Sequence, residues 1–184
     1  MGGQAVHRAE QVLLLTRLAA DSGARRGELA ALRLQDLDGR VLTIERAASA
    51  EVIGPTKTGR TRRLTLGSFT AALWRTTLER WRARSPGPVF GPWLFSTHPH
   101  HETRITTTGL GHWFAQTCAE AGLPGVTLHR LRHSVATALV GRGEILQAQY
   151  RLGHANAYTT LRIYSHAQPL HDAIAADTLE ALYN

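Results

Sequence analysis

The strand-like segments of this sequence are confined to one short stretch, whereas the rest of the chain has helical spacing. The β-like segments are residues 41–47, 51–53 and 62–66, and Gly54, Pro55 and Gly59 separate them. Around this stretch, apolar residues recur every three to four positions, which is typical of amphipathic helices. The predicted helical segments are about 8–20, one through Leu29 and Leu32, 68–84, 107–121, 128–141, 144–152, 157–164 and 169–182. The pattern therefore predicts a mostly α-helical fold with a small three-stranded antiparallel sheet near its front.

The size and composition of the chain fit a single folded domain. Its 184 residues are enough to bury a hydrophobic core, and 43% are hydrophobic against 19% charged, which excludes a disordered chain. Without an internal repeat or a long linker, we expect one domain over residues 1–184, with a flexible start at 1–7. No apolar run approaches about 18 residues, which argues against a membrane span. The single cysteine, Cys118, cannot form an internal disulfide, so a reducing, cytoplasmic setting is expected.

The chain is strongly basic, with a net charge of +7 and an isoelectric point near 10.7. A compact basic domain usually binds a polyanion, and nucleic acid is the leading candidate. The alternative explanation is an arginine-rich composition inherited from a GC-rich coding sequence. Charge alone does not choose between the two, so the choice depends on where the basic residues stand.

The segment "GARRGEL" places Arg25 at the start of a predicted helix, with Glu28 one turn further on. A helix N-terminus presents free N–H groups to an anion, and an arginine adds two directed donors. The alternative is an ordinary surface ion pair between residues three apart.

The segment "GPTKTGRTRRLTL" contains Lys57, the only lysine of the chain, in the turn between two predicted strands. Lysine, unlike arginine, can release a proton at workable pH, so a lone lysine here hints at a proton donor. An exposed turn lysine without a chemical role is the alternative.

The segment "LHRLRHSVATAL" carries His129 and Arg132 on one face of a predicted helix that Thr127 can cap. Further on, His154 follows Gly153 in "YRLGHANAYTTLRIYSH", and Tyr164 comes ten residues later. A tyrosine in an apolar helix is usually a packing residue, and a lone histidine is usually structural. The order and spacing of the four segments carry more weight than any one of them.

Taken in order, these four segments resemble the catalytic domain of tyrosine recombinases, the phage-type integrases. The similarity spans roughly residues 12–166 and is closest in "SGARRGELAALRLQDLD", "LHRLRHSVAT" and "LGHANAYTTLRIYSH". It implies the DNA breaking-rejoining fold and site-specific DNA recombination, by integration or excision, through a 3′-phosphotyrosyl intermediate. It also implies that neither a cofactor nor a metal is needed.

The resemblance assigns a role to each residue of the four segments. Tyr164 would attack the DNA phosphodiester, while Arg25, Arg132 and His154 hold its non-bridging oxygens. His129 would accept or relay the proton of the phenol, and Lys57 would protonate the departing 5′-oxygen. Glu28 is expected to orient the arginine cluster and His129. Three further arginines are expected to contact DNA: Arg60, Arg62 and Arg130.

The resemblance also implies partners and missing parts. We expect double-stranded DNA as partner, a homotetramer on DNA, a monomer alone, and a bacterial or phage, nucleoid-associated location. The DNA-gripping N-terminal domain of the family is expected to be absent here, and residues 169–184 would form a C-terminal helix that couples protomers. The alternative functions are relaxation of DNA in the manner of type IB topoisomerases, or DNA binding without catalysis.

Three other sequence features are expected to be structural and not part of the site. His98, His100 and His101 stand in a proline-containing loop without fixed ligand geometry, so we expect no metal there. The four tryptophans are expected to pack in the interior. Before the His154 segment, residues 149–151 are polar or aromatic where relatives often carry an apolar pair, so the packing there is expected to differ.

Overall fold

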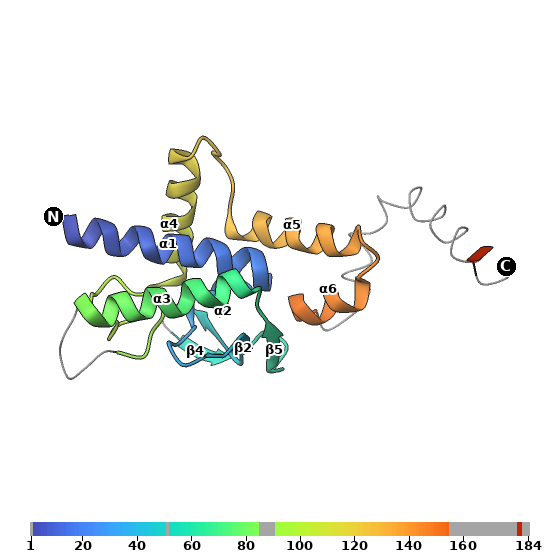
Figure 1. Ribbon diagram of the computed structural model, residues 1–184, viewed down its shortest axis with the longest axis horizontal. Coiled ribbons are helices and arrows are strands. Elements are labelled where there is room, and N and C mark those ends of the chain that lie inside the picture. Colours follow the sequence, from blue (N-terminus) through green and yellow to red (C-terminus); the bar gives the residue numbers. More distant parts are fainter. Residues whose placement is uncertain (1, 51, 85–90, 155–179, 182–184) are drawn as a thin grey trace.

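A computed structural model of the chain describes residues 2–50, 52–84, 91–154 and 180–181 (Figure 1). The described helices confirm the predicted helical fold, and most start and end within one or two residues of the prediction. They are α1 (Gly2–Ser22), α2 (Arg26–Ala30), α3 (Ser68–Arg84), α4 (Thr107–Glu120), α5 (Leu128–Val140) and α6 (Ile145–Leu152). The predicted helices at 157–164 and 169–182 lie outside the described residues, apart from 180 and 181, which are helical.

The short strands form an antiparallel sheet and a separate hairpin. β1 (Leu37–Asp38), β2 (Val41–Ile44) and β5 (Arg62–Thr65) make a three-stranded sheet in the order β1-β2-β5, whereas β3 (Arg46–Ser49) pairs only with β4 (Val52–Pro55). A small three-stranded antiparallel sheet is present, as predicted, but its strands differ: the predicted strand 41–47 divides after Ile44, the predicted segment 51–53 belongs to the hairpin, and β1 takes its place in the sheet. Arg46, the first residue of β3, pairs through its guanidinium with Asp36 at 2.7 Å.

The sequence predicted a flexible start at residues 1–7, and the structure describes residues 2–7 as helical. The structure continues α1 back to Gly2, because side chains of its first turns have tertiary partners. His7 contacts the Trp81 and His101 rings, with centroids 5.0 Å away in both cases, and Arg8 donates to Gln116 Oε1 at 2.7 Å. Residues 2–7 therefore form the first turns of α1.

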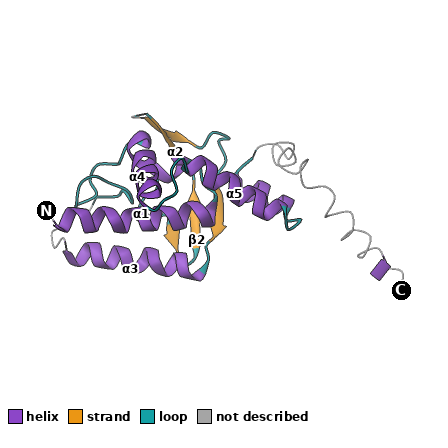
Figure 2. Ribbon diagram, turned by 90° about the horizontal axis from the view of Figure 1, so that it is seen from above, coloured by secondary structure: helices purple, strands orange, loops and turns teal. Residues whose placement is uncertain are grey.

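The main core lies between α1, α3, α4 and the sheet, and α1 and α3 run side by side in both views (Figure 1, Figure 2). Leu14, Leu15 and Leu18 of α1 are fully buried, and Trp74 and Trp81 of α3 are buried beside them. Burial of such side chains contributes roughly 1.5–3 kcal/mol each. This core fixes the segments on which the predicted site residues stand.

A second, smaller cluster joins α5 to α6. It consists of Ala136, Val140, Ala148 and Leu152, and it lies at the C-terminal end of α1 (Figure 1). Gly23, just after α1, packs closely against α6, because a Cβ at this position would lie 2.8 Å from Leu152 Cδ2. Among the described residues, no helix is both long and apolar enough to cross a membrane.

Candidate active site

A cleft of about 860 Å³ is lined by residues of five separate segments. Its walls come from the start of α2, the β4–β5 turn, one face of α4, the start of α5 and the residue two positions after α6. The structure brings five of the predicted site residues to this cleft: Arg25, Lys57, His129, Arg132 and His154. Tyr164 lies outside the described residues. The segments thus converge on one place, as the predicted chemistry requires.

Arg25 is fixed at the N-terminus of α2 by two hydrogen bonds that it donates to the Glu28 carboxylate. The Arg25 backbone N–H donates to Glu28 Oε2 at 2.7 Å, and its Nη1 donates to Oε1 at 3.1 Å. A glutamate at the third helical position commonly reaches back in this way. The pairing predicted from sequence exists, yet it is not a surface pair, because Glu28 is 1% exposed.

The buried Glu28 carboxylate keeps its charge because two arginines surround it. Arg62 donates to it through Nη1 at 3.0 Å and Nη2 at 2.6 Å. Burial alone would raise the pKa of Glu28, but the hydrogen bonds and charge of Arg62, followed by those of Arg25, outweigh burial and lower it. Among the described residues, the hydrogen bonds to the Glu28 carboxylate all come from these two arginines. Glu28 was also expected to orient His129, but no described contact joins the two residues.

Arg132 lies on α5 with its guanidinium at the back of the cleft, and the residue is 8% exposed. It donates through Nη1 to the Gly23 carbonyl and through Nη2 to the Leu152 carbonyl at 2.7 Å. Burial, together with the neighbouring charges of Arg25 and Arg62, lowers the pKa of Arg132 to about 10, and Glu28 partly opposes this shift. Arg132 therefore remains a cation at neutral pH.

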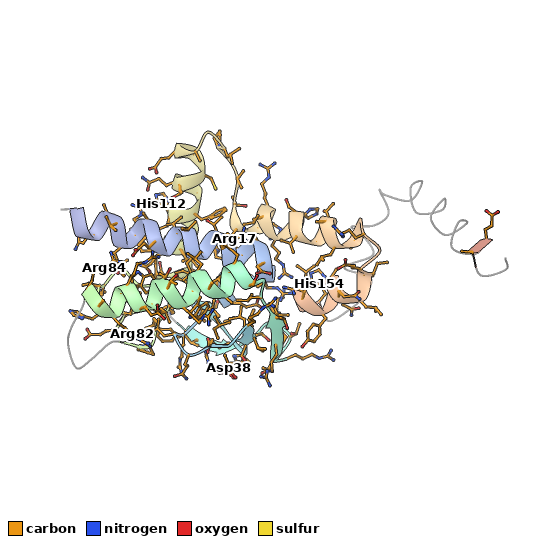
Figure 3. The ribbon with its side chains drawn as sticks, in the orientation of Figure 1. Arg17, Asp38, Arg82, Arg84, His112 and His154 are labelled. Carbon is orange, nitrogen blue, oxygen red and sulfur yellow. The ribbon has the colours of Figure 1, made fainter. Side chains whose placement is uncertain are left out.

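His154 stands directly after the left-handed Gly153, which ends α6 with φ 63°. The turn is closed by hydrogen bonds from the backbone N–H of His154 to Gln149 O and of Gly153 to Tyr150 O, both at 3.1 Å. Figure 3 shows His154 beside α6, close to the end of α1. Burial and the charges of Arg132, Arg25 and Arg62 lower the pKa of His154 to about 4. At neutral pH its ring is uncharged and offers one N–H donor.

Of the five predicted site residues at the cleft, Lys57 and His129 are the exposed ones. Lys57 stands just after β4, and Gly59, with φ 66°, allows the chain to reverse beside it. His129 follows the cap of α5, where the Thr127 hydroxyl accepts the N–H of Arg130 at 3.2 Å. Both can therefore meet a ligand that enters from solvent.

The three predicted DNA contacts differ in placement. Arg60 and Arg130 are exposed, as a DNA contact requires. Arg62, by contrast, is 5% exposed, and all three of its guanidinium nitrogens are engaged within the protein. The alternation of β5 turns Arg62 inward and Arg63 outward. We correct the prediction for Arg62: it lies behind the cleft and not on the DNA-facing surface.

Sequence reasoning missed the wall that α4 contributes. Thr108, Gly111, His112 and Ala115 line the cleft, and His112 is labelled on α4 in Figure 3. Their spacing of three and four residues places them on one helix face, which could have been found from the periodicity. The spacing alone, however, does not tell whether this helix face borders a cleft or is simply exposed to solvent.

The histidine loop has a packing role in the structure. His101 is fully buried and stacks on Trp81 at 4.6 Å between ring centroids. Its Nδ1 donates to the Trp93 carbonyl at 2.8 Å, and its Nε2 lies 3.1 Å from His7 Nε2. Within the described ranges, no cluster of three or more histidine, cysteine or acidic side chains is arranged to hold a metal.

Comparisons with known proteins find similar sequences and folds. The model of the phage integrase family matches residues 5–171. The tyrosine recombinase XerC of Pediococcus pentosaceus is 31% identical over 175 residues, covering 89% of this chain and 54% of that protein. XerC of Serratia marcescens is 34% identical over 153 residues, covering 80% and 48%. The chain thus spans about half the length of these relatives.

Two solved structures have a similar fold. The site-specific recombinase XerH, in a post-cleavage complex on its palindromic difH substrate, has a TM-score of 0.67 and 27% identity, covering 98% of this chain and 48% of that one. The Tn1549 transposon integrase, in complex with a circular intermediate DNA, has a TM-score of 0.72 and 22% identity, covering 90% and 57%. The second likeness, at its low identity, concerns the fold alone.

Proposed function

Because this chain belongs to the phage integrase family, we propose that it is the catalytic domain of a site-specific tyrosine recombinase. The cleft lined by Arg25, Lys57, His129, Arg132 and His154 is the observation that carries this proposal. Two arginines and a neutral histidine at one place can bind a phosphate from several sides. Lysine and histidine at the rim can exchange protons with it. Recombinase relatives do not favour the alternative of simple DNA relaxation.

The proposed reaction is a transesterification at a DNA phosphodiester. The Tyr164 oxygen forms a bond to phosphorus while the bond from phosphorus to the 5′-oxygen breaks, giving a 3′-phosphotyrosine and a free 5′-hydroxyl. His129 accepts the phenolic proton, and Lys57 supplies a proton to the leaving oxygen. Since each step exchanges one phosphate ester for another, the strand can be resealed to a new partner without an external energy source.

The charge that grows on the phosphorane oxygens is offset by side chains already in place. Arg25 and Arg132 bring two positive charges, and His154 adds a neutral N–H donor. Their own contacts with protein carbonyls hold them before DNA arrives, so little reorganisation accompanies the reaction. In this proposal the arginines do the work that a metal ion does in many nucleases.

The proposal extends to partners and location. Residues 1–184 are taken as one catalytic domain that acts on double-stranded DNA as a homotetramer, with the segment 169–184 coupling protomers and the free protein monomeric. The XerH complex with difH supports DNA as the substrate class. The proposed location is the bacterial cytoplasm, at the nucleoid.

The test is formation of a covalent protein–DNA adduct on a nicked duplex whose short 5′-fragment is lost after cleavage. The wild-type protein should give an adduct that a protease destroys, and Tyr164→Phe should give none while binding DNA about as well. Tyr158→Phe serves as the matched control and should still form the adduct. An adduct with Tyr164→Phe would mean that the nucleophile is another residue.

A further inference from the structure

The last turn of α6 is held by three different arginines, one on each of three consecutive carbonyls. Arg62 Nε donates to the Arg151 carbonyl at 3.1 Å. Arg132 Nη2 donates to the Leu152 carbonyl at 2.7 Å, and Arg25 Nη2 donates to the Gly153 carbonyl at 3.1 Å. The final carbonyls of a helix lack partners within the helix and carry partial negative charge. Cationic donors therefore suit this helix end.

Of these three arginines, Arg62 alone is missing from the lining of the cleft. It stands on β5, five positions after Lys57, and strand pairing with Ile44 of β2 fixes its place. Its Nη1 and Nη2 bind both oxygens of Glu28, and its Nε binds the end of α6. Arg62 thus joins two elements that carry cleft residues but have no direct chain connection: the start of α2 and the end of α6.

Each of these contacts is made with a group that directly positions one of the proposed phosphate-binding residues. Through Glu28, Arg62 acts on Arg25, because the same carboxylate holds the Arg25 backbone and side chain. Through the Arg151 carbonyl it acts on His154, which follows three residues later across the turn at Gly153. The Arg62 guanidinium packs closely against Gly153, since a Cβ at Gly153 would lie 2.9 Å from Arg62 Nη1.

We propose that Arg62 is a positioning residue of the recombination reaction, which sets Arg25 and His154 at the spacing that a single phosphate requires. The expected effect on catalysis rests on the proposed function. The claim that Arg62 fixes the positions of Arg25 and His154 does not depend on that function. The planar fork is essential to it, because one group must serve two carboxylate oxygens and a carbonyl at once. A lysine brings the same charge as a single point and cannot hold all three.

The test in catalysis compares Arg62→Lys with Arg63→Lys. Arg63 is the next residue on β5, is exposed, and undergoes the same chemical change, so it is the matched control. With saturating protein on the nicked duplex, Arg62→Lys should slow single-turnover adduct formation at least about 10-fold, because displacement of about 1 Å in a reacting site costs up to about 100-fold. The DNA dissociation constant should change less than about threefold. Arg63→Lys should cleave at the wild-type rate.

All rates are compared at a temperature where urea unfolding shows each variant to be folded. Equal cleavage rates for Arg62→Lys and the wild-type protein would overturn the proposal. So would a slower rate that is explained entirely by weaker DNA binding, since a residue that only contacts DNA would act in that way.

A second measurement needs neither DNA nor activity. In Arg62→Lys, the backbone N–H groups of Gly153 and His154 should exchange with solvent faster than in the wild-type protein, while those of the buried half of α1 should not change. In the wild-type protein, the Nε–H of Arg62 should give a slowly exchanging NMR signal, which remains measurable if the variant does not fold. An Arg62 Nε–H that exchanges as fast as that of Arg63 would overturn the proposal.

The two sets of results separate this proposal from the proposed function. If the wild-type protein forms no adduct, the proposed function fails, whereas the exchange experiment still reports whether Arg62 fixes the end of α6. If the adduct forms and the exchange is unaffected by Arg62→Lys, the function stands and the positioning role is wrong.

Discussion

At the residue scale, Glu28 links Arg25 at the cleft to Arg62 behind it. It is buried, charged and bound by Arg25 and Arg62. We expect Glu28→Gln to destabilise the folded protein by about 3 kcal/mol, because loss of one partner of a buried pair leaves the other charge uncompensated. Urea unfolding at neutral pH measures this loss. A change no larger than that of an exposed control such as Glu79→Gln would contradict it.

The same carboxylate predicts how stability depends on pH. Folding lowers the pKa of Glu28 below its ordinary 4.5, so its stabilising contribution is complete above that value and is lost as pH falls through the lower pKa of the folded state. The stability difference between the wild-type protein and Glu28→Gln should therefore be constant above about pH 5 and shrink below about pH 4.5. The subtraction cancels the histidines, which titrate in both proteins. A constant difference down to pH 3 would contradict the assignment.

His154 should report the arrival of an anion. In the free protein its pKa is about 4, because burial and three arginines disfavour a further positive charge. A phosphate analogue such as vanadate brings negative charge to the cleft and should raise the pKa of His154. By linkage, vanadate should then bind more tightly as pH falls through the raised pKa. NMR titration of the His154 ring, with chloride at equal ionic strength as control, checks this; an unchanged pKa would mean that the anion binds elsewhere.

Lys57 has a role that a modified substrate can isolate. If it protonates the leaving 5′-oxygen, Lys57→Ala should slow adduct formation on the order of 10²–10⁴-fold on ordinary DNA. A substrate with sulfur at the bridging 5′-position should restore the rate, because a thiolate leaves without a proton. Adduct formation on both substrates measures this. Absence of rescue, with DNA affinity reduced instead, would make Lys57 a phosphate-binding residue.

The sequence could predict which residue types meet at the site, but not the direction of every side chain. Arg25, Lys57, His129, Arg132 and His154 could be identified because each belongs to a short ordered motif. Arg62 could not be told from its neighbour Arg63, because a run of two arginines looks the same whichever one faces inward. Strand register decides this, and register depends on the pairing of Ile44 with Arg62 across the sheet.

At the element scale, local periodicity predicted the helices well and the β segments less well. α3 and α5 could be predicted almost to the residue because each buries one face at helical spacing. α2, by contrast, ends at Ala30 although the apolar pattern continues to Leu32. The chain leaves the helix there because Leu32 and Leu34 exchange backbone hydrogen bonds with Leu94 and Pro92. Such pairing between distant segments leaves no mark on local spacing.

The end of α6 is the element boundary on which the site depends most. Gly153 has a positive φ, and a methyl group at its Cα would approach Arg62 Nη1 to 2.9 Å. We expect Gly153→Ala to cost about 1–2 kcal/mol from the left-handed conformation and, in addition, to displace the Arg62 guanidinium and slow adduct formation. Gly143→Ala is the control, since it has φ 78° but open space around its Cβ position. Equal cleavage rates for the two variants would show that only the backbone strain of the positive φ matters at Gly153, and that contact with Arg62 has no effect on cleavage.

At the scale of the whole molecule, the cleft lies where two packing units meet. Arg25 and Glu28 stand beside Leu29 and Ala30 of the main core, whereas Arg132 and His154 are on or next to the helices α5 and α6 that form the smaller cluster. The small unit is attached to the rest partly by polar contacts. Tyr150 donates its hydroxyl proton to the Arg63 carbonyl at 3.1 Å, and Arg151 donates to the Thr65 carbonyl at 3.0 Å. These contacts give Tyr150 and Arg151 a structural role in a segment that the sequence marked as unusual without giving a cause.

The net charge of +7 leads to the last prediction, which concerns DNA binding by the whole chain. If Arg25, Lys57 and Arg132 together neutralise the scissile phosphate, and Arg60 and Arg130 one further phosphate each, three phosphates are neutralised, and the logarithm of affinity should fall with the logarithm of salt with a slope of about −2.7. Between 50 and 200 mM salt, affinity for duplex DNA should then drop about 40-fold.

Fluorescence anisotropy with a labelled duplex measures this slope. The two exposed arginines, Arg60 and Arg130, offer a sharper test than the total, because Arg60→Ala and Arg130→Ala should each reduce the slope by about 1. Arg84→Ala, at the far end of α3, removes the same charge from a residue paired with Glu10 and should leave the slope unchanged. If all three variants reduced the slope equally, DNA would be sensing the overall charge of the domain and not the surface around the cleft.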